Sequence, residues 1–212
     1  MKFKAVIFDM DGVIIDSEPL SMRALEATAD AMAYSIPRAN MDAYPGKAAH
    51  VVYKDVAGFG DGRFSIGEFE TLYCAIYSAW LPFVATIPGA LELYAHARSV
   101  LKLPVGLATS TARDWAEDVV AKLALDFDTV VAQEDVAFNK PAPDAYLKAS
   151  SALGVSPSDC LVFEDSLSGV AAGVAAGCTV WAYDGSFPRA ELLARGAHRV
   201  FSSHFDIIEA LS

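Results

Sequence analysis

The chain has 212 residues, of which 54% are hydrophobic and 20% are charged, a balance that excludes an intrinsically disordered chain. Its 27 acidic residues outnumber its 16 basic residues, so the formal net charge is −11. A surface this acidic repels nucleic acids and anionic lipids, and we expect neither as a partner.

The cysteines and the N-terminal residues favour a cytoplasmic protein. The three cysteines match neither a disulfide framework nor metal-ligand spacing: Cys74, Cys160 and Cys178. Asp9 and Asp11 interrupt the first apolar stretch too early for a signal peptide. No window contains the roughly 18 uncharged apolar residues that a membrane span requires.

Short apolar runs of strand character alternate along the chain with stretches of helical period. The runs are Ala5–Phe8, Val105–Ala108, Val130–Ala132, Leu161–Phe163, Thr179–Ala182 and Val200–Phe201. Most of them lack polar alternation, which is typical of strands buried on both faces of a parallel sheet. The helical stretches include Arg113–Leu123, Asp144–Leu153 and Ser168–Ala176. This order predicts an α/β fold with a doubly wound parallel sheet.

One interval departs from this alternation. The residues between Asp16 and Phe83 have helical periodicity but little strand character, and Ser17 is a candidate N-cap with Pro19 in the first turn. About 65 residues are too many for a single crossover. We therefore predict a helical domain at 17–83 inserted into a core domain of residues 1–16 and 84–212.

Two aspartates follow the first predicted strand, in the sequence Asp9-Met10-Asp11-Gly12. Ligands of open parallel sheets bind beyond the carboxyl ends of the strands. Residues i and i+2 point in similar directions, so both carboxylates can face one ligand. Such a pair repels unless a cation lies beside it. The alternative is an ordinary polar loop, in which Asp and Gly are common.

Three further polar positions follow later strands or lie just beyond them. The hydroxyls and amides of Thr109 and Ser110 could bind phosphoryl oxygens, although they could also form an ordinary helix cap. Lys140 lies in a proline-stiffened turn and could neutralise transferred charge, or be a solvated surface lysine. Glu164 and Asp165 are costly to bury without a partner such as Mg²⁺. Together with the aspartate pair, these positions favour a phosphoryl-transfer site.

The same residues resemble the four motifs of the haloacid dehalogenase superfamily, specifically its phosphatase and β-phosphoglucomutase-like branch. The matching stretches are Phe8–Pro19, Ala108–Ser110, Lys140–Asp144 and Val162–Ser166. The resemblance covers nearly the whole chain. It implies a Rossmann-like core with an inserted α-helical cap that closes over the site.

The resemblance also implies a role for each residue. Asp9 is expected to be the nucleophile that forms an aspartyl-phosphate, and Asp11 the general acid and then the general base. Mg²⁺ is expected to be held by Asp9, the backbone carbonyl of Asp11 and Asp165, with Glu164 nearby. Physically, such a metal would offset the charge of the phosphoryl transition state.

The remaining motif residues are expected to act on the phosphoryl group. Thr109 and the amide of Ser110 would hold its oxygens, and Lys140 would balance its negative charge. The implied function is a cytoplasmic Mg²⁺-dependent phosphatase for a small phosphorylated metabolite, such as a sugar phosphate. We expect a monomer or a weak dimer.

A sugar phosphomutase is the alternative within the same branch. Mutases carry a His where this chain has Ser21, and an Arg where it has Ala49, three residues after Gly46. Lys47 and His50 could partly substitute, so Gly46, Lys47 and His50 are the candidates for substrate specificity. The loss of both mutase groups favours the hydrolase.

A receiver-like phosphoacceptor domain is the alternative from another class of protein. Receiver domains also combine an Asp pair, Mg²⁺, Ser/Thr and Lys on a doubly wound sheet. They are much shorter than this chain and carry no inserted helical cap, which favours the enzyme.

Overall fold

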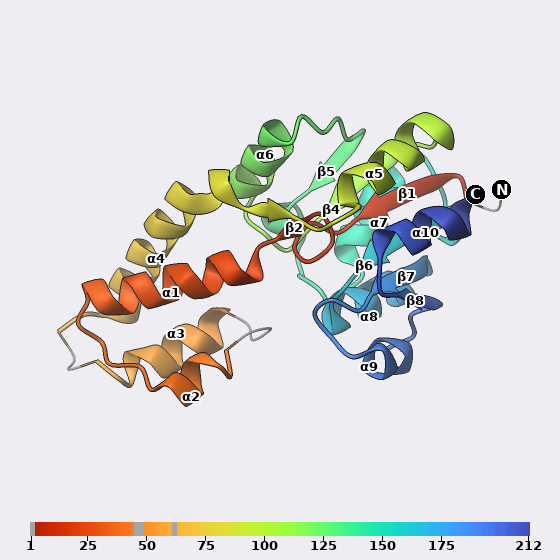
Figure 1. Ribbon diagram of the computed structural model, residues 1–212. Helices are drawn as coiled ribbons and strands as arrows, with labels where there is room; N and C mark the ends of the chain where they lie inside the picture. Colours follow the sequence, from red (N-terminus) through yellow and green to blue (C-terminus); the bar gives the residue numbers. More distant parts are fainter. Residues whose placement is uncertain (1–2, 45–48, 61–62) are drawn as a thin grey trace. The chain divides into compact units, whose positions relative to one another are not determined.

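A computed structural model describes residues 3–44, 49–60 and 63–212 (Figure 1). The chain forms two compact units. The core unit contains Met1–Asp16 and Ala85–Ser212, and the helical unit contains Ser17–Val84.

The core unit is built on a six-stranded parallel sheet with strand order β5-β4-β1-β6-β7-β8. The strands are β1 (Ala5–Phe8), β4 (Val105–Ala108), β5 (Thr129–Val131), β6 (Cys160–Glu164), β7 (Thr179–Tyr183) and β8 (Arg199–Phe201). Each coincides with a predicted run to within two residues at either end, which confirms the predicted parallel α/β sheet. Phe8 pairs with Leu107 and Phe163, so the central strands end close together.

Helices cover both faces of this sheet because its central strands alternate fully buried side chains between the two faces. They are α5 (Ala90–Ala95), α6 (Arg113–Lys122), α7 (Asp144–Ala152), α8 (Leu167–Ala175), α9 (Arg189–Ala194) and α10 (His204–Leu211). Ile7 and Val162 share one buried cluster with Tyr146 of α7. On the other face, Phe8 contacts the ring of Tyr94 of α5, and α5 lies beside α10 (Figure 1).

Short turns complete the backbone. A π-helical segment, His96–Val100, extends α5, and single 3₁₀ turns span Leu81–Phe83, Gln133–Asp135 and Pro157–Asp159. The Lys140-Pro141 peptide is cis.

Two glycines of α8 allow the helix to lie close to the sheet. A Cβ on Gly169 would stand 1.6 Å from Oε1 of Glu164, and one on Gly173 would stand 2.7 Å from Cγ2 of Val180. Gly169 and Gly173 therefore allow close helix–sheet packing at these two positions. Gly177 differs, because it follows the helix with φ +83° and has no atom near the position of a Cβ.

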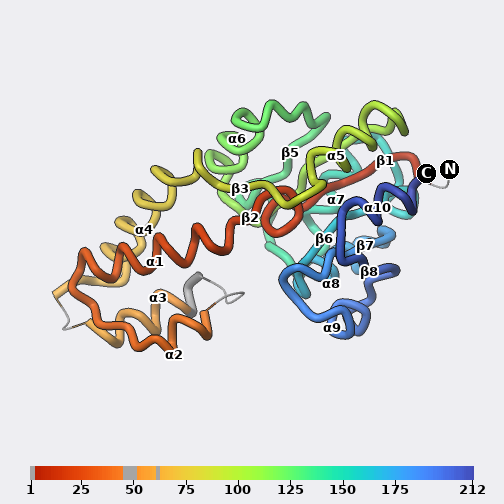
Figure 2. Tube along the Cα trace, viewed as in Figure 1, coloured from red at the N-terminus to blue at the C-terminus, as the bar shows by residue number. Residues whose placement is uncertain are grey.

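A second, two-stranded sheet was not predicted from the sequence. β2 (Ile15–Asp16) pairs antiparallel with β3 (Ala85–Thr86), and Figure 2 shows the two side by side. Two residues are too few to form a recognisable strand pattern. This two-stranded sheet lies where the chain leaves the core unit for the helical unit and where it returns to the core unit.

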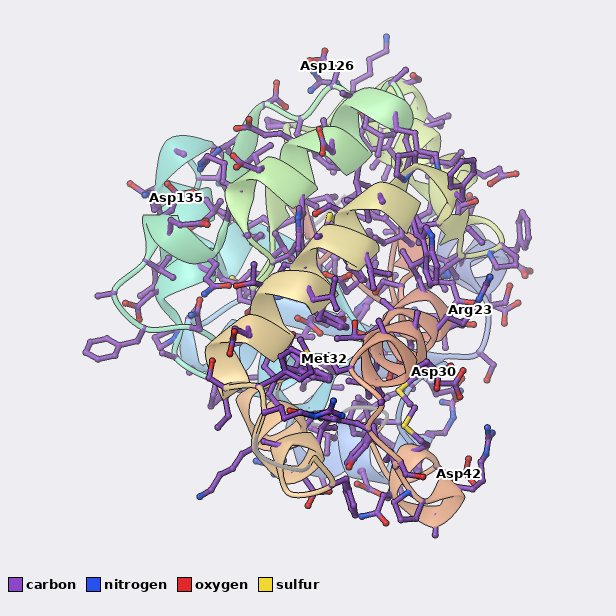
Figure 3. The ribbon with its side chains drawn as sticks, turned by 90° about the vertical axis from the view of Figure 1, so that its left-hand side faces the viewer. Arg23, Asp30, Met32, Asp42, Asp126 and Asp135 are labelled. Carbon is purple, nitrogen blue, oxygen red and sulfur yellow. The ribbon has the colours of Figure 1, made fainter. Side chains whose placement is uncertain are left out.

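The predicted helical insertion is confirmed and follows β2. It contains α1 (Glu18–Ala31), α2 (Arg38–Met41), α3 (Ala49–Ala57) and α4 (Ile66–Trp80). Exposed Arg23 and Asp30 lie on the outward side of α1 (Figure 3), whereas Leu25 is buried. Ser17 precedes α1 at the N-cap, but its side chain makes no capping hydrogen bond.

The start of α4 is capped more fully than that of α1. The Ser65 hydroxyl accepts a hydrogen bond from the backbone N–H of Glu68, and the Glu68 carboxylate accepts one from the backbone N–H of Ser65. This reciprocal pair satisfies two donors that a helix start otherwise leaves open. None of the helices in the described ranges is both long enough and apolar enough to cross a bilayer.

We predict that Gly173→Ala lowers the free energy of unfolding by about 1–3 kcal/mol, because the new methyl group overlaps Val180. Urea denaturation followed by circular dichroism measures the change. Gly67→Ala is the matched control, since Gly67 is exposed in α4 and a Cβ there meets only Ser65 Oγ at 4.0 Å. The control should be stabilised by roughly 0.5–1 kcal/mol. Equal stability of the two variants would contradict the packing argument.

We also predict acid destabilisation through His204, which is fully buried beneath the ring of Tyr183. Burial lowers the pKa of His204 below its ordinary value of 6.5. Below pH 6.5 the unfolded chain takes up this proton first, so stability falls as the pH falls, by up to about 1.4 kcal/mol per pH unit. The variant His204→Leu should lose less stability than the wild type between pH 6.5 and 5. Parallel stability curves would contradict this assignment.

Candidate active site

The predicted site residues of the core unit lie at the carboxyl ends of neighbouring strands. Asp9 follows β1, Thr109 follows β4, and Asp165 follows β6. These strands are adjacent in the sheet, with β1 in the middle. Lys140 arrives from the loop between β5 and α7. The parallel register therefore brings together residues that are far apart in the sequence.

Lys140 holds the centre of this cluster. Its Nζ lies 2.6 Å from Oδ1 of Asp9, 2.8 Å from Oε1 of Glu164 and 3.0 Å from the carbonyl oxygen of Ala108. Only 4% of the side chain is exposed. Burial alone would lower the pKa of Lys140, but the charges of Asp9 and Glu164 outweigh burial and raise it. The lysine is therefore a buried, protonated cation and not a solvated one.

Glu164 is saturated with donors from the protein. Its Oε1 accepts hydrogen bonds from Lys140 and from the hydroxyl of Tyr146, at 2.8 and 2.7 Å. Its Oε2 accepts from the backbone of Asp165 and from the backbone and hydroxyl of Ser166, each at 3.0 Å. Burial opposes ionisation, but Lys140 and these donors prevail and lower the pKa of Glu164. The carboxylate thus anchors the lysine.

Asp165 is held in place from two sides. The hydroxyl of Ser186, in the loop after β7, donates a hydrogen bond to Oδ2 of Asp165. Gly12, with φ +74°, lies so close that a Cβ there would stand 1.9 Å from the same oxygen. A side chain at position 12 would displace the carboxylate, which explains why this tight turn carries glycine.

Three buried carboxylates form a group suited to a cation. One ligand oxygen each from Asp9, Glu164 and Asp165 lie within 4.8 Å of one another. Burial and the neighbouring acids raise the pKa of Asp9, while Lys140 acts in the opposite direction. Burial and Glu164 raise the pKa of Asp165 to about 7. A single ammonium leaves this cluster with excess negative charge, so its donor set fits a hard divalent cation.

Asp11 lies beside this group and interacts with the loop after β4. Its Oδ2 accepts a hydrogen bond of 2.6 Å from the hydroxyl of Thr111 and lies 3.5 Å from that of Thr109. The Thr109 hydroxyl accepts from the backbone N–H of Thr111 at 3.1 Å. Within the described chain, no protein acceptor takes the backbone N–H of Ser110, which leaves that amide available to an anion.

The three residues expected to contribute to substrate specificity lie wholly or partly outside the part of the chain that the structure describes. Gly46 and Lys47 lie outside the described residues, and so does the side chain of His50. Their expected contribution to specificity stays a prediction.

Four residues with a structural role at the site were not predicted from the sequence: Thr111, Tyr146, Ser166 and Ser186. Thr111 directly follows the stretch Ala108–Ser110 and Ser166 ends the stretch Val162–Ser166, so the sequence could have indicated both hydroxyls. Tyr146 has only the pattern of a buried helix residue, although its ring lies 4.8 Å from Lys140 Nζ. Ser186 comes from a distant loop, and no local pattern indicates its contact with Asp165.

Comparisons with known proteins identify relatives of similar length. Residues 3–177 match the family described as haloacid dehalogenase-like hydrolase. The chain is 33% identical to validoxylamine A 7'-phosphate phosphatase of Streptomyces hygroscopicus subsp. limoneus, over 82% of this chain and 83% of that protein. It is 32% identical to hexitol phosphatase A of Escherichia coli strain K12, over 85% and 82% of the two chains.

A solved structure agrees with the observed fold. The crystal structure of a putative β-phosphoglucomutase from Thermotoga maritima superposes with a TM-score of 0.86 at 28% identity, covering 99% of this chain and 98% of that one. The receiver-like alternative is therefore wrong, since the chain matches a hydrolase family and carries the inserted helices α1–α4. The chain belongs to the haloacid dehalogenase-like hydrolases, in the β-phosphoglucomutase-like branch with a helical cap.

Proposed function

We propose that the protein is a Mg²⁺-dependent phosphatase that hydrolyses a small phosphate monoester through an aspartyl-phosphate on Asp9. The observation that carries the proposal is the contact of Lys140 Nζ with Oδ1 of Asp9. A buried lysine on one oxygen of the carboxylate fixes its orientation and leaves the other oxygen for attack on phosphorus. Hydrolysis through a covalent intermediate divides one difficult step into two easier ones.

Charge neutralisation is the main requirement of this chemistry. The phosphoryl group carries negative charge toward a site that already contains four carboxylates, and Lys140 offsets part of it. We assign the cation to Asp9 and Asp165. When bound, a divalent cation would offset the repulsion between the nucleophile and the phosphoryl oxygens. Since both oxygens of Glu164 are occupied by donors, we propose that Glu164 positions Lys140 and does not bind the cation directly.

Proton transfer is assigned to Asp11. In the first step Asp11 gives a proton to the leaving oxygen, and in the second it removes one from the attacking water. The hydroxyl of Thr111 holds the Asp11 carboxylate at 2.6 Å, so Thr111 is a positioning residue. Thr109 and the free amide of Ser110 are proposed to bind phosphoryl oxygens, as the following helix α6 favours an anion at its start.

The relatives favour hydrolysis over mutase chemistry. The two curated relatives described above are named as phosphatases of phosphorylated small molecules. The putative β-phosphoglucomutase is a more distant match in sequence, at 28% identity. A phosphomutase remains the second candidate because it would use the same nucleophile and cation.

We predict that Asp9→Asn lowers kcat for p-nitrophenyl phosphate by at least about a hundredfold, because the amide is not a nucleophile. Chelation of Mg²⁺ by EDTA should silence the wild type, and added Mg²⁺ should restore it. Circular dichroism controls for folding of the variant. Turnover that persists in EDTA would contradict the metal assignment, and an active Asp9→Asn enzyme would contradict the nucleophile.

A second prediction separates the two roles considered for Glu164. Glu164→Gln should lower kcat by at least about tenfold, because Lys140 loses its charged anchor. The Mg²⁺ concentration for half-maximal activity should rise less than in a variant that removes a ligand, because in this assignment Glu164 contacts donors of the protein and not the cation. Asp165→Asn is the matched comparison and should raise that concentration by at least about tenfold. Equal increases of this Mg²⁺ concentration in both variants would indicate that Glu164 is a metal ligand.

A further inference from the structure

The loop after β7 reaches the candidate active site from the neighbouring strand. Residues 184–188 connect β7 to α9, and Ala182 near the end of β7 pairs with Glu164 of β6. Because the strands are parallel, this loop and the segment that holds Asp165 emerge at the same edge of the sheet. The hydroxyl of Ser186 donates its hydrogen bond to Oδ2 of Asp165, from one strand end to the next.

Both ends of this loop are tied to β8 and to the residue that follows it. The backbone N–H of Asp184 donates to the carbonyl oxygen of Phe201 at 2.9 Å. The carboxylate of Asp184 accepts a hydrogen bond of 3.0 Å from the hydroxyl of Ser202. At the other end, the guanidinium of Arg189 donates to the carbonyl oxygen of Val200 at 2.7 Å. The loop is therefore fastened on either side of Ser186.

The two residues that flank Ser186 restrict the loop further. A Cβ on Gly185 would stand 2.2 Å from Cε1 of Tyr183, so the backbone lies close against that ring. Phe187 is partly buried and packs against the cluster that contains Tyr146. With both ends tied and both neighbours packed on the core unit, the hydroxyl of Ser186 is held in a preformed position.

The two oxygens of Asp165 have different surroundings. Oδ2 accepts from Ser186, and a Cβ on Gly12 would stand 1.9 Å from it. No residue in the described ranges donates a hydrogen bond to Oδ1. A carboxylate has a broad preference about its terminal torsion, so a hydrogen bond on Oδ2 decides which way Oδ1 faces. Carboxylates that ligate metals are commonly held by such outer partners.

We propose that Ser186 is a positioning residue, which holds Oδ2 of Asp165 and thereby presents Oδ1 to the divalent cation. The inference rests on the proposed function, because the cation is the one assigned there to Asp9 and Asp165. Ser186 acts through Asp165 and does not itself bind the cation. The affinity of the site for the cation is therefore set in part by the loop after β7 and by its attachment to β8.

Binding of Mn²⁺ tests this role independently of turnover. Mn²⁺ takes the same kinds of oxygen ligands as Mg²⁺, and electron paramagnetic resonance measures the Mn²⁺ that stays free in solution. Ser186 is exposed, so its truncation leaves no cavity in the core. Ser186→Ala should raise the Kd for Mn²⁺ by about 3–10-fold, the value of one hydrogen bond. Ser186→Thr keeps the hydroxyl and should stay within about twofold of the wild type.

Two further variants serve as references. Asp165→Asn should weaken Mn²⁺ binding more than Ser186→Ala does, because it removes the charge of a ligand. Ser158→Ala is the matched control and should bind Mn²⁺ as the wild type does. Ser158 is likewise exposed, and its hydroxyl lies 3.1 Å from that of Ser156, in the turn that precedes β6. That turn is at the opposite end of the strand from Asp165.

Turnover gives a second readout of the same effect. In Ser186→Ala, the Mg²⁺ concentration for half-maximal hydrolysis of p-nitrophenyl phosphate should rise by the same factor as the Kd for Mn²⁺. A variant that changed turnover without changing either metal parameter would contradict a role through Asp165.

The outcomes separate this inference from the proposed function. A wild type that binds no Mn²⁺, or an Asp165→Asn variant with unchanged Mn²⁺ affinity, would overturn the metal assignment of the proposed function. If both behave as expected but Ser186→Ala, shown to be folded by circular dichroism, binds Mn²⁺ as tightly as the wild type, the role of Ser186 alone is overturned. The same holds if Ser186→Thr binds as weakly as Ser186→Ala, since the hydroxyl would then not be the cause.

Discussion

The buried ammonium group of Lys140, placed between the carboxylates of Asp9 and Glu164, is the interaction on which the rest of the site depends. All three side chains are almost wholly removed from water. Lys140 is positive and the two carboxylates are negative, and each charge would be costly to bury alone. The hydroxyl of Tyr146 and the donors of Ser166 complete the hydrogen bonds of Glu164, so the ion pair has a defined geometry. That geometry orients Asp9.

The parallel sheet makes this arrangement possible. Because β1 lies between β4 and β6, the three polypeptide segments that follow these strands emerge side by side. Close packing then determines the positions of individual carboxylates at the site. Gly169 allows α8 to approach Glu164, and Gly12 allows the first loop to approach Asp165. At both positions a single methyl group would displace a carboxylate of the site, so the two glycines matter to chemistry as well as to folding.

The two units differ in the chemistry that their buried polar groups can perform. The core unit concentrates charge, with three carboxylates and one lysine around the proposed nucleophile Asp9. A pocket of the helical unit is lined by hydroxyls, aromatic rings and aliphatic groups, with one acid.

The parallel α/β core, the inserted helices and the family could be predicted from the sequence, because apolar runs and short motifs are local patterns. Asp9, Asp11 and Asp165 were identified beside predicted strand ends, and Lys140 in a proline-stiffened turn further along the chain. What these groups contact became visible only in the folded chain. The contacts of Lys140 and Tyr146 with Glu164 and the hydrogen bond from Ser186 to Asp165 join segments that are distant in the chain. No local pattern encodes such contacts, since they arise only when strand register and helix packing bring those segments together.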